Sequence, residues 1–137
     1  MARPWLEETR LHPAIRDAVN HLHAEVVHNV QAASLSNAVL VVGMAGNPFC
    51  KRARKVLDAA GVPYHYLEYG SYFKGWRERL ALKMWTGWPT FPMVFVKGSL
   101  VGGADDVARL IDSGELNRLD FSWRNRRSRR YIMAPGL

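Results

Sequence analysis

The clearest hydrophobic pattern lies in the middle of the chain, where a short apolar run precedes an amphipathic stretch. Residues 39–42 read Val-Leu-Val-Val, and residues 43–46 interrupt the run with two glycines. A run this short beside glycine is typical of a strand buried on both faces of a sheet. Asn47 and Pro48 fit the N-cap and first position of a helix, because the missing proline N–H would have had no intrahelical partner. We predict a strand, a sharp loop and a helix that Gly61 ends.

Apolar residues at three- to four-residue spacing predict an amphipathic helix before this strand. It runs from Pro13 to about Ala33, and we expect it to cover one face of the sheet. A second such helix is predicted from about Lys74 to Trp85. The apolar positions of the first helix are Ile15, Val19, Leu22, Val26 and Val30, and those of the second are Trp76, Leu80, Leu82 and Met84.

The remaining elements follow from alternation and turn residues. Residues 64–69 alternate aromatic and polar side chains and predict a strand parallel to the first, joined by a right-handed crossover. Residues 93–96 and 100–101 are β-rich and are separated by a hairpin turn at Lys97-Gly98-Ser99. Gly102-Gly103 then allow a tight turn into a last helix that begins near Ala104. The pattern therefore predicts an α/β protein.

Length and composition limit the protein class. The chain has 137 residues, of which 48% are apolar, so we expect one domain with a substantial core. No run approaches the ~18 apolar residues of a membrane helix, and the N-terminus lacks a secretory hydrophobic region, so we expect a cytoplasmic protein with no membrane partner. The single cysteine excludes an internal disulfide but allows a mixed or intermolecular one.

Positive charge is concentrated at the C-terminus. The net charge is +7, and residues 120–137 contribute +4 of it through five arginines against Asp120. A basic terminal run of this kind can attract nucleic acid or an acidic partner through counterion release. A solvated tail, or one that is partly docked, is the alternative.

Three further groups of residues carry candidate chemistry. Cys50 falls in the first turn of the predicted central helix, where unpaired N–H groups and the helix dipole favour a thiolate. His21, Glu25 and His28 share a helical face, but one face offers too few ligands for zinc, so we expect no metal site. Three aromatic residues between residues 70 and 76 either shape a substrate surface or pack in the core: Tyr72, Phe73 and Trp76.

Several of these segments together resemble a known family. Residues 47–53, Asn-Pro-Phe-Cys-Lys-Arg-Ala, resemble the active-site helix of glutaredoxins, which carry Cys-Pro-Tyr-Cys or Cys-Gly-Phe-Ser there. The segments at 88–92 and 102–105 resemble that family's cis-proline loop and glutathione-binding turn. The resemblance covers about residues 38–119, is closest to monothiol members, and implies a thioredoxin-like fold with a mixed four-stranded sheet flanked by helices. Residues 1–37 would be an N-terminal extension with its helix, and residues 120–137 a basic tail.

The resemblance also implies a glutathione site. A cis peptide before Pro92 would leave the Phe91 backbone free to pair with the cysteinyl unit of glutathione. The turn before Asp105 would donate N–H groups to the γ-glutamyl carboxylate, Asp105 would accept from the α-ammonium, and Arg79 would meet a carboxylate. The implied glutathione-binding residues are Asn47, Phe49, Arg79, Thr90, Phe91, Pro92, Gly103, Ala104 and Asp105.

The same register shows where the chain departs from the family. Asn47 stands where the family has its nucleophilic cysteine, and Cys50 stands where dithiol members have the resolving one. Because the usual thiolate ligand is missing, we expect no iron–sulfur cluster of the monothiol kind. Ala45 replaces a lysine found in many monothiol members. Cys50 is the one candidate catalytic residue, at a position where the family thiol is more buried and less reactive.

Three functions remain open on the sequence. The first is a glutathione-dependent thiol–disulfide oxidoreductase or electron carrier that uses Cys50 and acts on glutathionylated proteins. The second is a catalytically degenerate module that binds glutathione or a peptide and recruits a partner protein. The third is a basic accessory domain that acts on nucleic acid.

Overall fold

The computed structural model describes residue 4 and residues 6–116, so the predicted arginine-rich tail lies outside the described residues. Helices and strands follow one another along the chain in this order: η1 (Glu8–Arg10), α1 (Pro13–Asn20), α2 (Ala24–Ser36), β1 (Val39–Gly43), α3 (Pro48–Ala59), β2 (His65–Glu68), α4 (Trp76–Thr86), β3 (Met93–Val96), β4 (Ser99–Gly102) and α5 (Ala104–Asp112).

The four strands form one mixed sheet in the order β2-β1-β3-β4. β1 is parallel to β2, with Val41 opposite Tyr66, and antiparallel to β3, with Val41 opposite Val94. β3 and β4 form an antiparallel hairpin whose turn residues Lys97 and Gly98 both have positive φ, the geometry that matches the twist of a two-residue hairpin. The predicted parallel pair, the hairpin and the mixed four-stranded sheet are confirmed.

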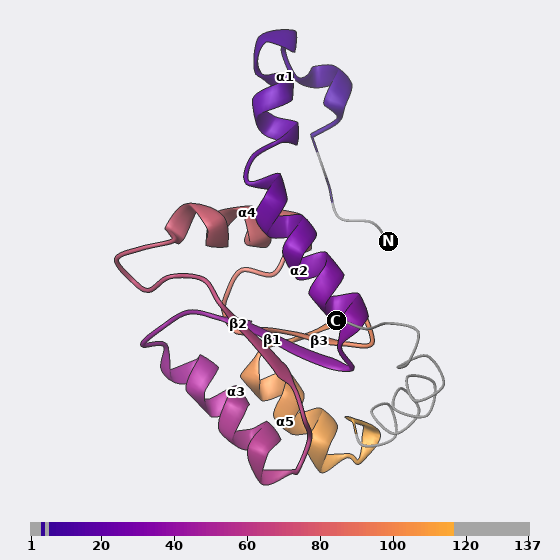
Figure 1. Cartoon of the computed structure of the whole chain (residues 1–137). Coiled ribbons are helices and arrows are strands. Elements are labelled where there is room, and N and C mark those ends of the chain that lie inside the picture. The colour runs from indigo at the N-terminus through magenta and orange to yellow at the C-terminus, as the bar shows by residue number, and fades with distance from the viewer. Residues whose placement is uncertain (1–3, 5, 117–137) are drawn as a thin grey trace.

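Helices cover both faces of the sheet (Figure 1). Val39 and Val41 of β1 pack with the α3–α5 layer, whereas Leu40 and Val42 pack with the α2–α4 layer. Burial of each of these four side chains stabilises the fold by roughly 1.5–3 kcal/mol relative to leaving it exposed. The continuous apolar run of β1 is explained by this position between two cores.

The prediction of one long N-terminal helix is wrong. The chain instead forms α1 and α2, which are separated at His23, whose φ of 45° is left-handed. Val30 of α2 is fully buried, but Ile15 and Val19 of α1 are exposed, so only α2 covers the sheet. The apolar spacing continues across the break, but the apolar residues of α1 do not pack on the sheet.

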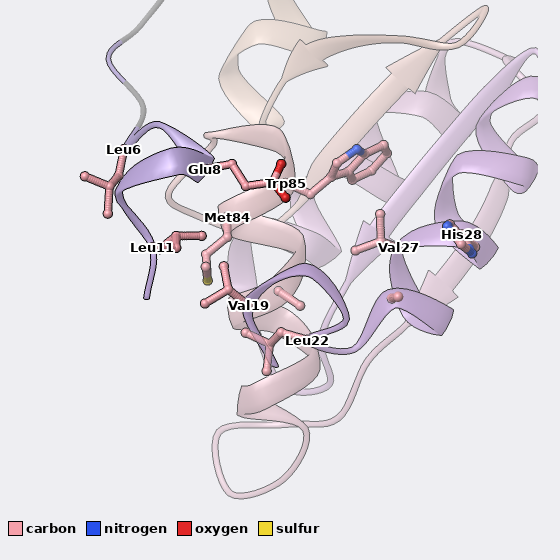
Figure 2. A pocket seen from close by; sticks show the side chains of 11 residues that line it. Leu6, Glu8, Leu11, Val19, Leu22, Val27, His28, Met84 and Trp85 are labelled. Atoms are coloured by element: carbon pink, nitrogen blue, oxygen red, sulfur yellow. The ribbon is translucent and has the colours of Figure 1, made fainter. Parts of the chain in front are cut away.

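The N-terminal segment and α4 border an apolar groove of about 410 Å³. Figure 2 shows Leu11, Val19 and Leu22 gathered around Met84 of α4. The predicted apolar face of α4 is therefore only partly correct: Leu82 is buried, but Trp76, Leu80 and Met84 are exposed. The buried face of α4 instead consists of Arg79, Ala81 and Leu82.

No helix among residues 6–116 is long and apolar enough to cross a membrane.

Candidate functional site

The N-terminus of α3 is capped by Asn47, as the sequence predicts. The Asn47 Oδ1 accepts hydrogen bonds from the N–H groups of Phe49 at 2.8 Å and Cys50 at 3.0 Å, and Pro48 occupies the first helical position. An asparagine at this position typically stabilises a helix by about 1 kcal/mol relative to alanine. Two N–H groups that a thiolate at residue 47 would use are thus already satisfied by an amide oxygen.

Cys50 lies beneath the surface, not at the rim of a groove. Its side chain is 1% exposed and belongs to the core cluster that also contains Leu40 and Met44. A Cβ added to Gly43 would lie 2.9 Å from the Cys50 Sγ and 3.0 Å from the Tyr66 hydroxyl. The sulfur therefore fits against a strand position that only glycine leaves open.

The predicted thiolate character of Cys50 is wrong. Burial raises the pKa of the Cys50 thiol above its ordinary value, and Glu68 adds to the rise. The backbone of Met44 and the charge of Arg54 lower this pKa, but by less. Desolvation disfavours the charged form of a buried group, and it is the largest influence on the pKa of Cys50. Cys50 is therefore a packed thiol whose thiolate form is disfavoured by burial.

A pocket of about 220 Å³ lies between the start of α3, the 88–92 loop and the start of α5. Seven of the predicted glutathione-binding residues line it: Phe49, Thr90, Phe91, Pro92, Gly103, Ala104 and Asp105. The Phe91–Pro92 peptide is cis, as the resemblance implies. Among the described residues, no hydrogen bond uses the Phe91 backbone N–H or C=O. An extended peptide could therefore pair with Phe91 as an added strand does.

The turn into α5 supplies the second side of this pocket. The Gly103 N–H donates to Asp106 Oδ2 at 2.9 Å, and the other Asp106 oxygen accepts from Arg109 at 2.6 Å. These contacts hold the pKa of Asp106 below its ordinary value, with the Gly103 bond as the largest cause. The Gly103 N–H is thus occupied, and the N–H groups of Ala104 and Asp105 are the helix-start donors without an intrahelical acceptor.

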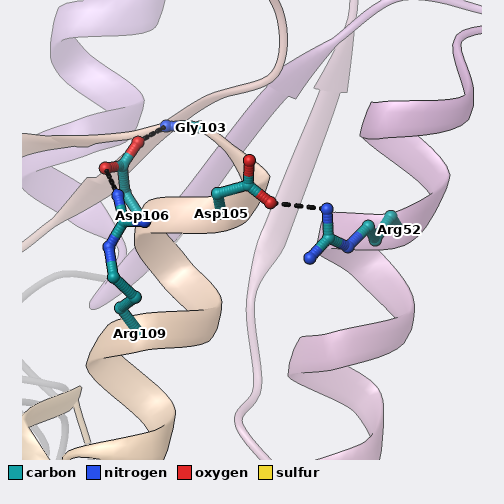
Figure 3. Close-up of polar contacts among 5 residues, drawn as sticks. All are labelled: Arg52, Gly103, Asp105, Asp106 and Arg109. Atoms are coloured by element: carbon teal, nitrogen blue, oxygen red, sulfur yellow. Dashed lines mark hydrogen bonds and ion pairs between the residues drawn. The ribbon is translucent and has the colours of Figure 1, made fainter.

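Asp105 is paired across the pocket entrance. Its Oδ1 lies 2.5 Å from Arg52 Nη1, and both side chains are at least half exposed (Figure 3). A surface pair of this kind contributes roughly 0–1 kcal/mol, so a ligand cation can replace Arg52 at little cost. The sequence does not reveal this pair, because 53 residues separate its partners.

Arg79 is held away from this pocket. It is 7% exposed, and its Nη1 donates to the carbonyls of Tyr69 at 2.9 Å and Lys74 at 2.7 Å. The predicted contact between Arg79 and glutathione has no support from this position. The β2–α4 loop turns two backbone carbonyls inward, and the guanidinium satisfies them.

Trp88 and Asp106 also line the pocket but were not among the predicted site residues. The Nε1 of Trp88 is buried without a partner in the described part of the chain. The sequence contained evidence that could have identified both residues as part of the site. Trp88 lies in the segment that resembles the cis-proline loop, and Asp106 lies in the first turn of the predicted last helix.

The residues at the start of α3 do not fit an iron–sulfur cluster. Residue 47 offers an amide where a thiolate would be needed, and the Cys50 sulfur packs against Gly43. Within residues 6–116, no cluster of three His, Cys, Asp or Glu side chains could hold a metal ion. His21, Glu25 and His28 therefore do not converge.

A cis-proline loop that faces a helix N-terminus beside a mixed four-stranded sheet defines a thioredoxin-like protein. A family model described as Glutaredoxin matches residues 39–101. A glutaredoxin-like protein of Dictyostelium discoideum is 47% identical over 102 residues, which cover 74% of this chain and 83% of that protein. The chain belongs to the glutaredoxin family.

Two further comparisons bear on the site. The bifunctional monothiol glutaredoxin-S16 of Arabidopsis thaliana is 41% identical over 70 residues, but these are 50% of this chain and only 23% of that protein. The crystal structure of a buckwheat glutaredoxin–glutathione complex superposes with a TM-score of 0.66 at 27% identity, covering 74% of this chain and 93% of that one.

Proposed function

We propose that this protein is a cytoplasmic glutaredoxin-like module that binds glutathione, or a peptide resembling it, and recruits a partner without turning over disulfides. One observation carries the proposal: residues that would hold the tripeptide line one pocket, whereas the sulfur of Cys50 is buried. The similarity to a glutaredoxin crystallised with glutathione supports the choice of ligand.

The cysteinyl and γ-glutamyl parts of the ligand have complementary groups in the pocket. The cysteinyl backbone pairs with the N–H and C=O of Phe91, in the manner of an added strand. The γ-glutamyl carboxylate accepts from the N–H groups of Ala104 and Asp105 at the positive end of α5. The α-ammonium donates to the Asp105 carboxylate and takes the place of Arg52. Phe49, which is exposed at the rim, covers the bound peptide.

The competing function is a glutathione-dependent thiol–disulfide oxidoreductase with Cys50 as its catalytic residue. In that reaction the Cys50 thiolate attacks the glutathionyl sulfur of a glutathionylated protein and releases the protein thiolate. A glutathione thiolate then attacks the mixed disulfide on Cys50, which yields glutathione disulfide and restores the Cys50 thiolate. The Met44 backbone and Arg54 favour the thiolate, but the reaction also requires α3 to expose the sulfur.

Titration of the ¹⁵N-labelled protein with reduced glutathione tests binding. We expect amide shifts at Phe91, Ala104 and Asp105, and an affinity at least ~10-fold lower for Asp105→Ala, because the charge-assisted contact to the ligand's α-ammonium is lost. Asp112→Ala, at the other end of the same helix, is the matched control and should bind normally. The absence of shifts in the pocket would refute the glutathione site.

Reduction of a glutathionylated peptide tests turnover. The wild-type protein and Cys50→Ser should give the same rate, close to that of glutathione alone, because the Cys50 thiol is buried and its pKa is raised. A wild-type rate well above background that Cys50→Ser abolishes would establish the oxidoreductase instead.

A further inference from the structure

Hydrogen bonds within the loop between β2 and α4 fix its conformation, and the loop presents aromatic side chains to solvent. Ser71 and Lys74 exchange two backbone hydrogen bonds, at 2.9 and 3.3 Å, and the Ser71 Oγ accepts from the Phe73 N–H. Gly70 and Gly75 both have positive φ, and a Cβ on Gly75 would lie 2.9 Å from the Gly70 Cα. With Arg79 bonded to the Lys74 carbonyl, the loop is anchored from within the protein.

The side chains that this loop presents are large and apolar. Phe73 is 93% exposed, Tyr72 is 62% exposed, and Trp76 at the start of α4 is 56% exposed. Leu80 continues the exposed face one turn further, and Met84 begins the groove of Figure 2 one turn beyond it. The recurrence of Trp76, Leu80 and Met84 every four residues makes an apolar stripe along α4. The core-packing alternative for the three loop aromatics is wrong.

Cations flank this stripe. Apart from the buried Arg79, residues 70–86 contain three cationic side chains and one carboxylate, Glu78. Lys74 and Arg77 are exposed, and the Arg77 guanidinium lies 5.1 Å from the centre of the Trp76 ring. The Lys83 ammonium of α4 lies 5.8 Å from the centre of the ring of Phe91, a residue that lines the candidate glutathione pocket.

We propose that this stripe, with the groove at its end, is the docking surface for an acidic amphipathic helix of a partner protein. The inference rests on the proposed function as a recruiting module and names the partner that it recruits. The helix lays its apolar residues along Trp76 and Leu80 and into the groove beside Met84, while its carboxylates meet Lys74 and Arg77. A docked partner would lie beside the glutathione pocket.

Charge and shape favour this occupant over others. A second copy of the chain would bring the same cations against Lys74 and Arg77, and like charges at an interface are unfavourable. An elongated stripe that ends in a concave apolar groove complements one face of a helix, with anchors at i, i+4 and i+7, better than it complements a flat lipid surface or separate bases. Aromatic and arginine residues are also the commonest anchors of protein interfaces.

A designed peptide can serve as the probe. The peptide is helical, with leucines at i, i+4 and i+7 on one face and glutamates on the other, and carries a fluorophore for anisotropy measurements on the full-length protein. A scrambled peptide of the same composition and a version with lysine in place of glutamate are the controls. We expect the acidic amphipathic peptide to bind at least ~10-fold more tightly than either control, with amide shifts in residues 71–86.

Matched variants locate the contact. Phe73→Ser and Trp76→Ser should each weaken peptide binding at least ~10-fold, as loss of an aromatic anchor does. Leu35→Ser, which removes an apolar side chain of 62% exposure from α2, should leave it unchanged. Lys74→Glu combined with Arg77→Glu should weaken binding and reduce its salt dependence, whereas Lys55→Glu on α3 should do neither.

The possible outcomes are distinct. Equal binding of the scrambled peptide, or shifts elsewhere on the molecule, would overturn the proposal. So would self-association that Phe73→Ser abolishes, or binding to phosphatidylserine vesicles or a single-stranded oligonucleotide but not to the peptide. Glutathione titration of the Phe73→Ser variant should be unchanged, so failure of the peptide to bind does not count against the glutathione pocket, and failure of glutathione to bind does not count against the stripe.

Discussion

The pocket beside the start of α3 and the first turn of α3 itself differ in how much of the glutaredoxin site each retains. The 88–92 loop and the turn before α5 form a pocket from the backbone of Phe91 and the helix start at Ala104. The first turn of α3 has an amide cap at residue 47 and a buried sulfur at residue 50. Binding geometry built from backbone persists as long as the fold does, whereas thiol chemistry depends on a single exposed atom.

The largest expected effect comes from restoring the family's exposed thiol at residue 47. Asn47→Cys should raise the rate of reduction of a glutathionylated peptide by ~100-fold over wild type. The new thiolate would accept from the N–H groups of Phe49 and Cys50, as Asn47 Oδ1 does now, and helix N-termini lower thiol pKa values. The pH dependence of alkylation should give a pKa below the ordinary thiol value.

Asn47→Ser is the control for this experiment. Serine keeps a capping oxygen but supplies no thiol, so its rate should equal that of wild type. If Asn47→Cys remained as slow as wild type although alkylation showed a reactive thiolate, the pocket would not position glutathione, and the contrast between the two regions would fail.

The next effect probes how tightly the sulfur is packed. Gly43→Ala should destabilise the protein by about 1–3 kcal/mol, because its Cβ would meet both the Cys50 Sγ and the Tyr66 hydroxyl. In a Cys50→Ala background the cost should fall, since the alanine leaves the space that the sulfur occupied. Urea unfolding of the four proteins in this cycle measures the difference. Equal costs in both backgrounds would show that the sulfur does not contact Gly43.

Most of the fold was predictable because its signals are local. The apolar run of β1, the Asn47-Pro48 helix start and the Lys97-Gly98 turn each determine backbone conformation within a few residues. The break at His23 was not predictable, since periodicity reports which face is apolar and not whether the helix continues.

The site was predictable at the level of backbone position and less so for side chains. The resemblance located Phe91 and Asp105 correctly at one pocket, because the fold fixes where those residues lie. It could not show that Arg79 turns inward to the Tyr69 carbonyl, or that Arg52 reaches Asp105, because both depend on contacts between distant segments. For Cys50, the helix start predicted a thiolate and the resemblance implied a more buried, less reactive thiol; the structure shows that burial is the largest influence on its pKa.

The smallest effect is a pH dependence that follows from the same burial. Because the pKa of Cys50 is raised in the folded protein, the folded state keeps a proton that the unfolded state releases. The contribution of Cys50 to stability is therefore complete below the ordinary thiol pKa of about 8.5 and is lost as pH rises through the folded value. The free energy of unfolding should decline above about pH 8.5, by at most about 1.4 kcal/mol per pH unit.

Cys50→Ala isolates this contribution, because the variant has no thiol to titrate. Its free energy of unfolding should stay flatter than that of wild type between about pH 8 and 9.5. Burial and the bond to Glu68 also raise the pKa of Tyr66, but its ordinary value is 10.0, so its effect begins at higher pH. Parallel curves for the two proteins would mean that the Cys50 thiol is solvated in the folded protein. A divergence that starts near the ordinary thiol pKa would show that desolvation at the start of α3 disfavours the thiolate form of Cys50.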